Sequence, residues 1–183
     1  MVASVRPWAG EILRTWFHEL DSSDWYGGGK DVDTMLDRRF GSLLAALGNQ
    51  PVDDLLTHPR TALAAILLFN QVPRNIHRGT AGAFAHDGKA RALTHGVIAR
   101  DWLTDFSRRE RQFALMPLMH SEAIFDQRLS LRLFARHAPG ALPFARSHWR
   151  MIARFGRFPH RNAVLGRRTT PAEQQAINSG FTW

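Results

Sequence analysis

Two loops in this sequence carry arginine and asparagine side chains of the kind that bind small anions. QVPRNIHRGT spans residues 71–80 and RFPHRNAVLGRRT spans residues 157–169, and both contain Pro, Arg-Asn, Gly and Thr in that order. A guanidinium group forms paired hydrogen bonds with carboxylate or phosphate, and an Asn amide adds an orienting donor. If the two loops meet in the fold, their side chains would form a pocket for a small anion.

Histidines and a carboxylate that could transfer protons accompany these loops. His120 and Glu122 lie in the segment between them, His148 precedes the second loop, and His160 lies within it. In an enzyme, arginine would fix the substrate while a carboxylate or histidine moves the proton. Glu122 and His120 are therefore the candidate catalytic residues. The alternative is a network of buried Arg–carboxylate pairs that only locks loops to helices.

Metal binding is a second kind of chemistry, but the spacing of the His, Asp and Glu residues does not favour it. Glu122 and Asp126 lie four residues apart in one predicted helix, so their charges repel unless a cation compensates them. A metal held with His120, His148 or His160 could do so, but no HExxH or similar spacing is present. We expect the arginines of the C-terminal quarter to compensate the two acids, and we expect no metal and no cofactor.

The composition narrows the chemistry further. The 183 residues include no Cys, which excludes a disulfide framework, a thiolate metal site and a Cys nucleophile. The net charge is +8, and all of the excess lies in residues 127–172, where ten Arg occur without any Asp or Glu. Such a basic segment attracts nucleic acid, anionic lipid or phosphorylated metabolites. GC-rich coding would also explain the preference for Arg, with 22 Arg against 2 Lys.

Helices must position these side chains, because no segment of the sequence alternates like a β-strand. The stretch DWYGGGK at residues 24–30 is predicted as a mobile loop. No linker divides the chain, so we expect a single all-helical domain over residues 1–183. Helical periodicity and the connections rich in Gly, Pro, Asp or Asn predict helices over residues 9–20, 32–47, 60–71, 81–100, 108–115, 121–137, 143–155 and 171–179.

Several of these helix ends carry capping residues. Ser107 with Glu110, and Thr170 with Glu173, fit the capping box, in which each side chain bonds the other's backbone N–H. Gly156 is placed to end the helix over residues 143–155 in the left-handed conformation.

The helix over residues 143–155 is predicted to point His148 inward, because this residue lies in the middle of its apolar face. A lone inward His is more often a hydrogen-bonded core residue than a ligand or base. The apolar face consists of Phe144, Met151, Ile152 and Phe155, and the opposite face, which we interpret as solvated, carries Arg146, Arg150 and Arg154. The helix over residues 121–137 is apolar around most of its circumference, including Phe125, and is predicted to be buried between neighbours.

The N-terminal stretch MVASVRPWAGEILRTWF has no continuous apolar region of the kind found in secretory signals. No stretch approaches the roughly 18 consecutive apolar residues of a membrane-spanning helix. We therefore expect a soluble, cytoplasmic protein with no membrane partner.

Three motifs resemble those of the bacterial proteins grouped as domain of unknown function 924. They are LFNQVPRNIHRGTAGAFAHD, PLMHSEAIFDQ and RFGRFPHRNAVLGRRTTPAE, in this order and spacing, together with the N-terminal ILRTWF. The resemblance covers nearly the whole chain. It implies an all-α, tetratricopeptide-repeat-like stack of antiparallel helical hairpins in one domain, and it implies no particular reaction.

The family pattern falls on the residues already considered and adds others. Where the family commonly shows an Asp before Gln71, this chain has Asn70, which cannot act as a base. The expected ligand-binding residues are Arg74, Asn75, Arg78, His120, Glu122, Gln127, His148, Arg157, His160, Arg161, Asn162 and Arg167.

The leading hypothesis is recognition of a small anionic ligand, with Arg74 and Arg161 as bidentate clamps and Asn75 and Asn162 as orienting donors. Three alternatives remain. In the first, the protein would be an enzyme that uses Glu122 or His120 for proton transfer. In the second, it would be an interaction module that binds an acidic peptide in a concave groove. In the third, it would bind nucleic acid through two arginine stripes, Arg128, Arg132 and Arg136 and Arg146, Arg150 and Arg154, but no nucleic-acid motif accompanies these stripes.

Overall fold

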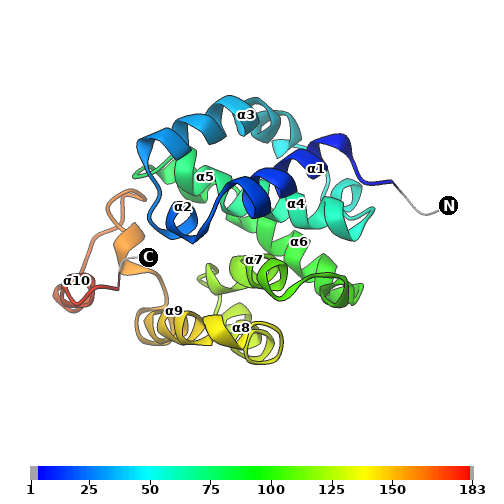
Figure 1. Ribbon diagram of the computed structural model, residues 1–183. Helices are drawn as coiled ribbons and strands as arrows, with labels where there is room; N and C mark the ends of the chain where they lie inside the picture. The colour runs from blue at the N-terminus through cyan, green and yellow to red at the C-terminus, as the bar shows by residue number, and fades with distance from the viewer. Residues whose placement is uncertain (1–3, 182–183) are drawn as a thin grey trace.

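The computed structural model describes residues 4–181 and shows an all-α fold, as predicted (Figure 1). No β-strand occurs within these residues. A π-helical turn at Thr15–Glu19 continues the first helix, and short 3-10 turns include Ala81–Phe84 and Pro159–Arg161. The α-helices are α1 (Pro7–Arg14), α2 (Ser22–Tyr26), α3 (Lys30–Gly48), α4 (Pro59–Asn70), α5 (Val72–Ile76), α6 (Asp87–Ala99), α7 (Arg108–Met119), α8 (Ile124–His137), α9 (Leu142–Phe155) and α10 (Pro171–Asn178).

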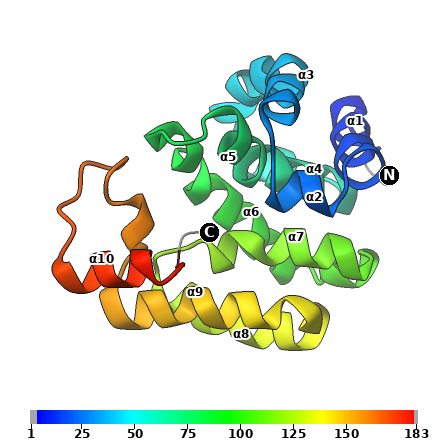
Figure 2. The ribbon, with the colours of Figure 1, turned by 60° about the vertical axis from the view of Figure 1, so that its left-hand side comes forward.

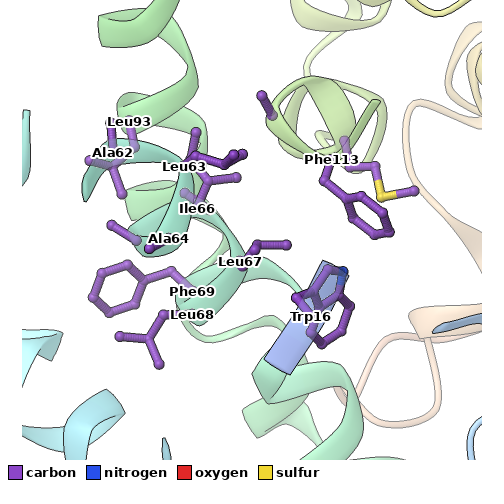
Figure 3. Close-up of a cluster of buried hydrophobic side chains, with 14 of the residues drawn as sticks. Trp16, Ala62, Leu63, Ala64, Ile66, Leu67, Leu68, Phe69, Leu93 and Phe113 are labelled. Carbon is purple, nitrogen blue, oxygen red and sulfur yellow. The ribbon is translucent and has the colours of Figure 1, made fainter. Parts of the chain in front are cut away.

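Helix α4 forms the centre of the core. Every residue from Thr61 to Asn70 is buried, because α1, α6 and α7 pack around the helix (Figure 3). Its sequence, TALAAILLFN, is apolar on all sides, as expected of a helix with no solvated face. Trp16 and Phe113 cover one side of it and meet edge to face, with ring centroids 5.7 Å apart. The last residue of this core helix, Asn70, reaches the site described below.

The remaining helices stack on this core as antiparallel hairpins. Helices α6 and α7, α7 and α8, and α8 and α9 are successive packed neighbours, and α8 and α9 lie together beyond α7 (Figures 1 and 2). Helix α3 packs on α5. Helix α10 and the loop before it form a second apolar cluster against α9, made by Met151, Ile152, Phe158 and Ala176. No helix within residues 4–181 combines the length and apolarity needed to cross a bilayer.

The predicted helix caps are present. Ser107 and Glu110 form a capping box at the start of α7, and Thr170 and Glu173 form one at the start of α10. Gly156 ends α9 with φ of 70°, in the left-handed region that a residue with a Cβ rarely adopts. These local signals fix where the C-terminal helices begin and end.

The structure corrects the predicted boundaries in three places. The predicted loop at 24–30 begins within α2, which a capping box of Asp21 and Asp24 initiates. The predicted helix 81–100 is two elements, because the hydrogen bond from Ala85 N to Gly82 O closes a 3-10 turn before α6 begins at Asp87. The predicted helix 121–137 begins only at Ile124.

Two aromatic side chains predicted to be buried are exposed. Phe125 on α8 is 78% exposed and Phe144 on α9 is 57% exposed. Phe125 lies in the first turn of α8, where no neighbouring helix covers it, and Phe144 lies at a cavity. By contrast, His148, Met151 and Ile152 are buried as predicted, and Arg146, Arg150 and Arg154 are exposed.

Candidate functional site

A cavity of about 600 Å³ lies between α2, α5, α7, α9 and the loop after α9. Helix α5 contributes Arg74 and Asn75 to its wall, the turn after α5 contributes Arg78, and the loop after α9 contributes His160 and Arg161. The segment at residues 71–80, which was predicted to be a loop, is therefore helical over Val72–Ile76. The two segments that share Pro and Arg-Asn in the sequence line one cavity in the fold. His120 from the end of α7 and His148 from α9 complete the set of polar side chains.

Asp87 joins the two loops. Its carboxylate accepts two hydrogen bonds from Arg74, from Nη1 to Oδ1 at 2.7 Å and from Nη2 to Oδ2 at 2.9 Å. Arg161 Nη1 lies 3.5 Å from the same Oδ2. Sequence reasoning missed Asp87 because it placed this residue inside a longer helix. The signal available was an acid followed by Gly88, a pairing typical of a helix start rather than an interior.

Arg161 is a buried cation with an incomplete set of acceptors. It is 6% exposed, and its guanidinium lies between the rings of Phe84 and Phe158, 4.5 Å from each centroid. The long contact with Asp87 is the only hydrogen bond of the guanidinium within residues 4–181, and Nε is buried without a partner there. Burial, and then the charge of Arg74, lower the pKa of Arg161 to about 10. The cation therefore persists at neutral pH in an unfavourable environment.

The three histidines at the cavity are neutral at physiological pH. Burial is the main cause in each case: it lowers the pKa of His148 to about 3 and that of His160 to about 4, and it lowers the pKa of His120 well below 6.5. The positive charges of Arg74 and Arg161 act in the same direction. The rings of His120 and His148 lie 5.8 Å apart.

Asn70 fixes the orientation of His120. Its Oδ1 lies 2.9 Å from His120 Nδ1 and also accepts a hydrogen bond from Gln71 Nε2, while its Nδ2 donates to Asp87 Oδ1 at 3.2 Å. Because that oxygen can only accept, His120 Nδ1 is the protonated nitrogen and Nε2 carries the lone pair. The amide at position 70 thus links a neutral imidazole to the Asp87 carboxylate without adding charge.

Glu122 lies outside this cavity and is held by structural bonds. Its Oε1 accepts from Arg167 Nη1 at 2.8 Å and from the backbone N–H of Phe158 at 2.9 Å. Burial raises the pKa of Glu122, but these two bonds together with the charges of Arg167 and Arg161 lower it below its usual value, so the group is ionised. It lines a second, smaller cavity of about 340 Å³ on the other side of Arg161, together with Arg167.

The two carboxylates that we expected to share compensating arginines have separate partners. Glu122 pairs with Arg167 from the basic C-terminal segment, as predicted. Asp126 instead accepts from Ser121 Oγ at 2.7 Å, lies 2.9 Å from His95 Nε2 and is 3.4 Å from Arg91. Because α8 begins after Glu122, the two acids do not share a helix face.

Three other predicted site residues stabilise the surrounding backbone and do not line the large cavity. Gln127 donates to the carbonyls of Met119 and Ser121, each at 2.7 Å. Asn162 is fully buried, with Nδ2 3.4 Å from Thr169 Oγ1. Arg157 pairs with Glu173 through two hydrogen bonds of 2.6 and 3.0 Å.

Several apolar and aromatic residues of the cavity were not predicted. Trp25 and Tyr26 come from α2, Met116 and Met119 from α7, and Phe84 precedes α6. The sequence signal for α2 was the acid pair Asp21 and Asp24, which forms its capping box, but the three glycines that follow favoured a loop prediction. Among the described residues, no group of three or more His, Asp or Glu side chains is placed to hold a metal ion.

The Glu173–Arg157 pair leads to a stability prediction. The Glu173 side chain is 3% exposed, and bonds from Arg157 and then Thr170 lower its pKa to about 2. We expect Glu173→Gln to lower the free energy of unfolding at pH 7 by about 2 kcal/mol, because Arg157, whose side chain is 31% exposed, loses its partner but stays partly solvated. Urea unfolding followed by circular dichroism measures this loss. The loss should shrink between pH 4.5 and 2, where Glu173 becomes protonated; an equal loss at pH 7 and pH 2.5 would contradict the charge argument.

The fold and the cavity define a class of protein: an all-α stack of helical hairpins around a buried helix, with a cationic, aromatic-lined cavity of about 600 Å³. The chain belongs to the family described as bacterial protein of unknown function (DUF924), whose family model matches residues 12–180. This confirms the resemblance seen in the sequence motifs.

A solved structure shows the same fold. The protein of unknown function ATU0120 from Agrobacterium tumefaciens is 33% identical in sequence and superposes with a TM-score of 0.88. The match covers 94% of this chain and 97% of that one. No protein with a curated description matches the chain.

Proposed function

We propose that this protein binds a small anionic ligand, bearing a carboxylate or a phosphate, in the 600 Å³ cavity. The observation that carries the proposal is Arg161, a cation that is 94% buried and has one long hydrogen bond. A buried charge without acceptors is strongly unfavourable, so structures keep such a group where a partner compensates it. An anion in the cavity would be that partner.

The neighbouring groups support an anion and not a cation. Among the residues that the structure describes, no Asp or Glu lines the cavity, and the three cavity histidines are neutral. The volume falls within the range of small-molecule sites, which is about 300–1,000 Å³, and is too small for a folded partner. Arg74 holds Asp87 in place with two hydrogen bonds and so positions the carboxylate against which Arg161 rests.

Thermal unfolding in the presence of anions tests the proposal. Monocarboxylates, dicarboxylates, inorganic phosphate and phosphate monoesters are each titrated against the full-length protein. A ligand that binds only the native state stabilises it by about 2.7 kcal/mol at one hundred times its Kd, which raises the midpoint in a concentration-dependent way. We expect at least one of these classes to give such a shift.

Arginine variants make the test specific to the cavity. Arg161→Lys keeps the charge but loses the planar fork, and we expect at least a tenfold weaker binding. Arg150→Ala removes an exposed arginine from α9 and should leave the shift unchanged. Shifts that survive in Arg161→Lys, or the absence of any shift in the wild-type protein, would contradict the proposal.

A further inference from the structure

The cavity is apolar over much of its wall. Side chains of Trp25, Phe84, Met116, Met119 and Phe144 face it, whereas its cationic groups are concentrated at Arg74, Arg78 and Arg161. Two aromatic residues of the wall are also exposed to solvent, Tyr26 at 62% and Phe144 at 57%. Exposed aromatic side chains beside a concave site indicate that an apolar surface of the ligand covers them.

The amide side chains in the cavity are engaged with the protein itself. Gln71 Nε2 donates to Asn70 at 2.7 Å, and Asn75 Nδ2 donates to the carbonyl of Gln71 at 3.1 Å. Gln112 Nε2 donates to the hydroxyl of Tyr26. A ligand rich in hydroxyl groups, such as a sugar phosphate, would have to compete with these bonds for the amide groups, so part of its desolvation would go uncompensated.

The charges around the cavity sum to a single excess positive charge. Arg78 is paired with Asp33 through two hydrogen bonds of 2.9 Å each. Arg74 and Arg161 share the one carboxylate of Asp87. A ligand with one negative charge balances this arrangement, while the dianion of a phosphate monoester exceeds it by one charge.

We infer that the ligand is a monocarboxylate with an apolar body, whose carboxylate pairs with Arg161 and whose body lies between Trp25, Met116 and Phe144. This inference rests on the proposed function and specifies its ligand class. The planar guanidinium fork matches a carboxylate, and the thioethers of Met116 and Met119 adapt to apolar bodies of irregular shape. The volume leaves room for a body much larger than that of acetate.

Isothermal titration of a matched series tests the ligand class. Butyrate, hexanoate and octanoate differ only in apolar length, octanamide removes the charge, and octyl phosphate adds a second one. We expect affinity to rise about fourfold for each methylene that is buried. We expect octanamide and octyl phosphate each to bind at least tenfold more weakly than octanoate. Inorganic phosphate serves as a compact anion without an apolar body.

Two variants separate the carboxylate from the apolar part of the site. Phe144→Ala should reduce the rise in affinity with the chain length of the ligand. Arg161→Lys should lower the affinity for butyrate, hexanoate and octanoate by a similar factor. Phe125→Ala, which removes an aromatic ring that is 78% exposed on α8 and does not line the cavity, is the control and should change neither. Circular dichroism verifies that each variant folds.

The outcomes distinguish this inference from the proposed function. If inorganic phosphate or butyrate binds through Arg161 but affinity does not rise with chain length, the anion site stands and the monocarboxylate inference is wrong. If octanamide binds as well as octanoate, the inference is also wrong, because the carboxylate contributes nothing. If no anion binds at all, both fail.

Discussion

Replacing Asp87 by Ala is expected to lower the free energy of unfolding by about 3–5 kcal/mol. The substitution removes the carboxylate that Arg74 and Arg161 share, and the side chain of Arg161 is just 7% exposed. A buried cation that loses its partner keeps its full desolvation penalty. Arg74 would also lose its bidentate anchor. Chemical denaturation at pH 7, followed by circular dichroism, measures the loss.

The surface pair of Arg78 and Asp33 is the matched control. Asp33 has the same exposure as Asp87, 20%, and also accepts two hydrogen bonds from one arginine, but the side chain of Arg78 is 53% exposed. Asp33→Ala should therefore cost about 1 kcal/mol or less. Equal losses in the two variants would show that burial of Arg161 does not determine the effect. Saturating octanoate should recover part of the stability of Asp87→Ala if the ligand compensates the same cation.

The protein should lose stability as the pH falls from about 6.5 toward 4. In the unfolded chain the rings of His120, His148 and His160 titrate near 6.5, whereas in the folded protein burial holds all three pKa values lower, at about 3 for His148 and about 4 for His160. The unfolded state therefore binds more protons in this range, so acid favours unfolding. Each ring contributes at most about 1.4 kcal/mol per pH unit, or about 4 kcal/mol per pH unit for all three.

Unfolding free energies at half-unit intervals from pH 7.5 to 4.5 measure this slope. His148→Gln should lower the slope of unfolding free energy against pH by about 1.4 kcal/mol per pH unit, which is the contribution of one proton. His18→Gln, which changes an exposed histidine, should leave the slope unchanged. Glu173 and Glu122, whose pKa values are lowered in the folded protein, add to the loss only below about pH 4.5. A stability that stays constant between pH 7 and 5 would contradict burial of the neutral rings.

Helical periodicity and capping residues were sufficient to predict the all-α fold. The capping boxes at Ser107 and Thr170 and the left-handed Gly156 depend on neighbours within four residues, so the sequence contains the whole signal. The family membership could be predicted for a similar reason, since three motifs kept their order and spacing. Short elements such as α2 were missed, because five residues provide too little periodicity to outweigh a following run of glycines.

The candidate site could be predicted only in its cationic half. The shared Pro and Arg-Asn pattern identified Arg74 and Arg161 as candidates but left open whether their two segments meet, and the structure places both arginines on one carboxylate. That carboxylate, Asp87, could not be identified, because its role depends on where α6 begins and on contacts across 74 residues of sequence. The aromatic wall depends on the packing of α2 against α7, where Trp25 meets Phe113 and Gln112 bonds Tyr26, and no local pattern encodes these contacts.

The contact of Arg161 with the rings of Phe84 and Phe158 has a consequence for how tightly an anion would bind. An arginine side chain in solution has about 2 kcal/mol of rotamer entropy to lose when it is immobilised. Here the rings of Phe84 and Phe158 each lie 4.5 Å from the guanidinium carbon of Arg161, so that ordering accompanies folding and precedes any encounter with a ligand. Because this ordering cost is not paid on binding, the affinity for an anion depends less on the contact area of the ligand. A ligand with few atoms would therefore be recognised with high affinity per atom.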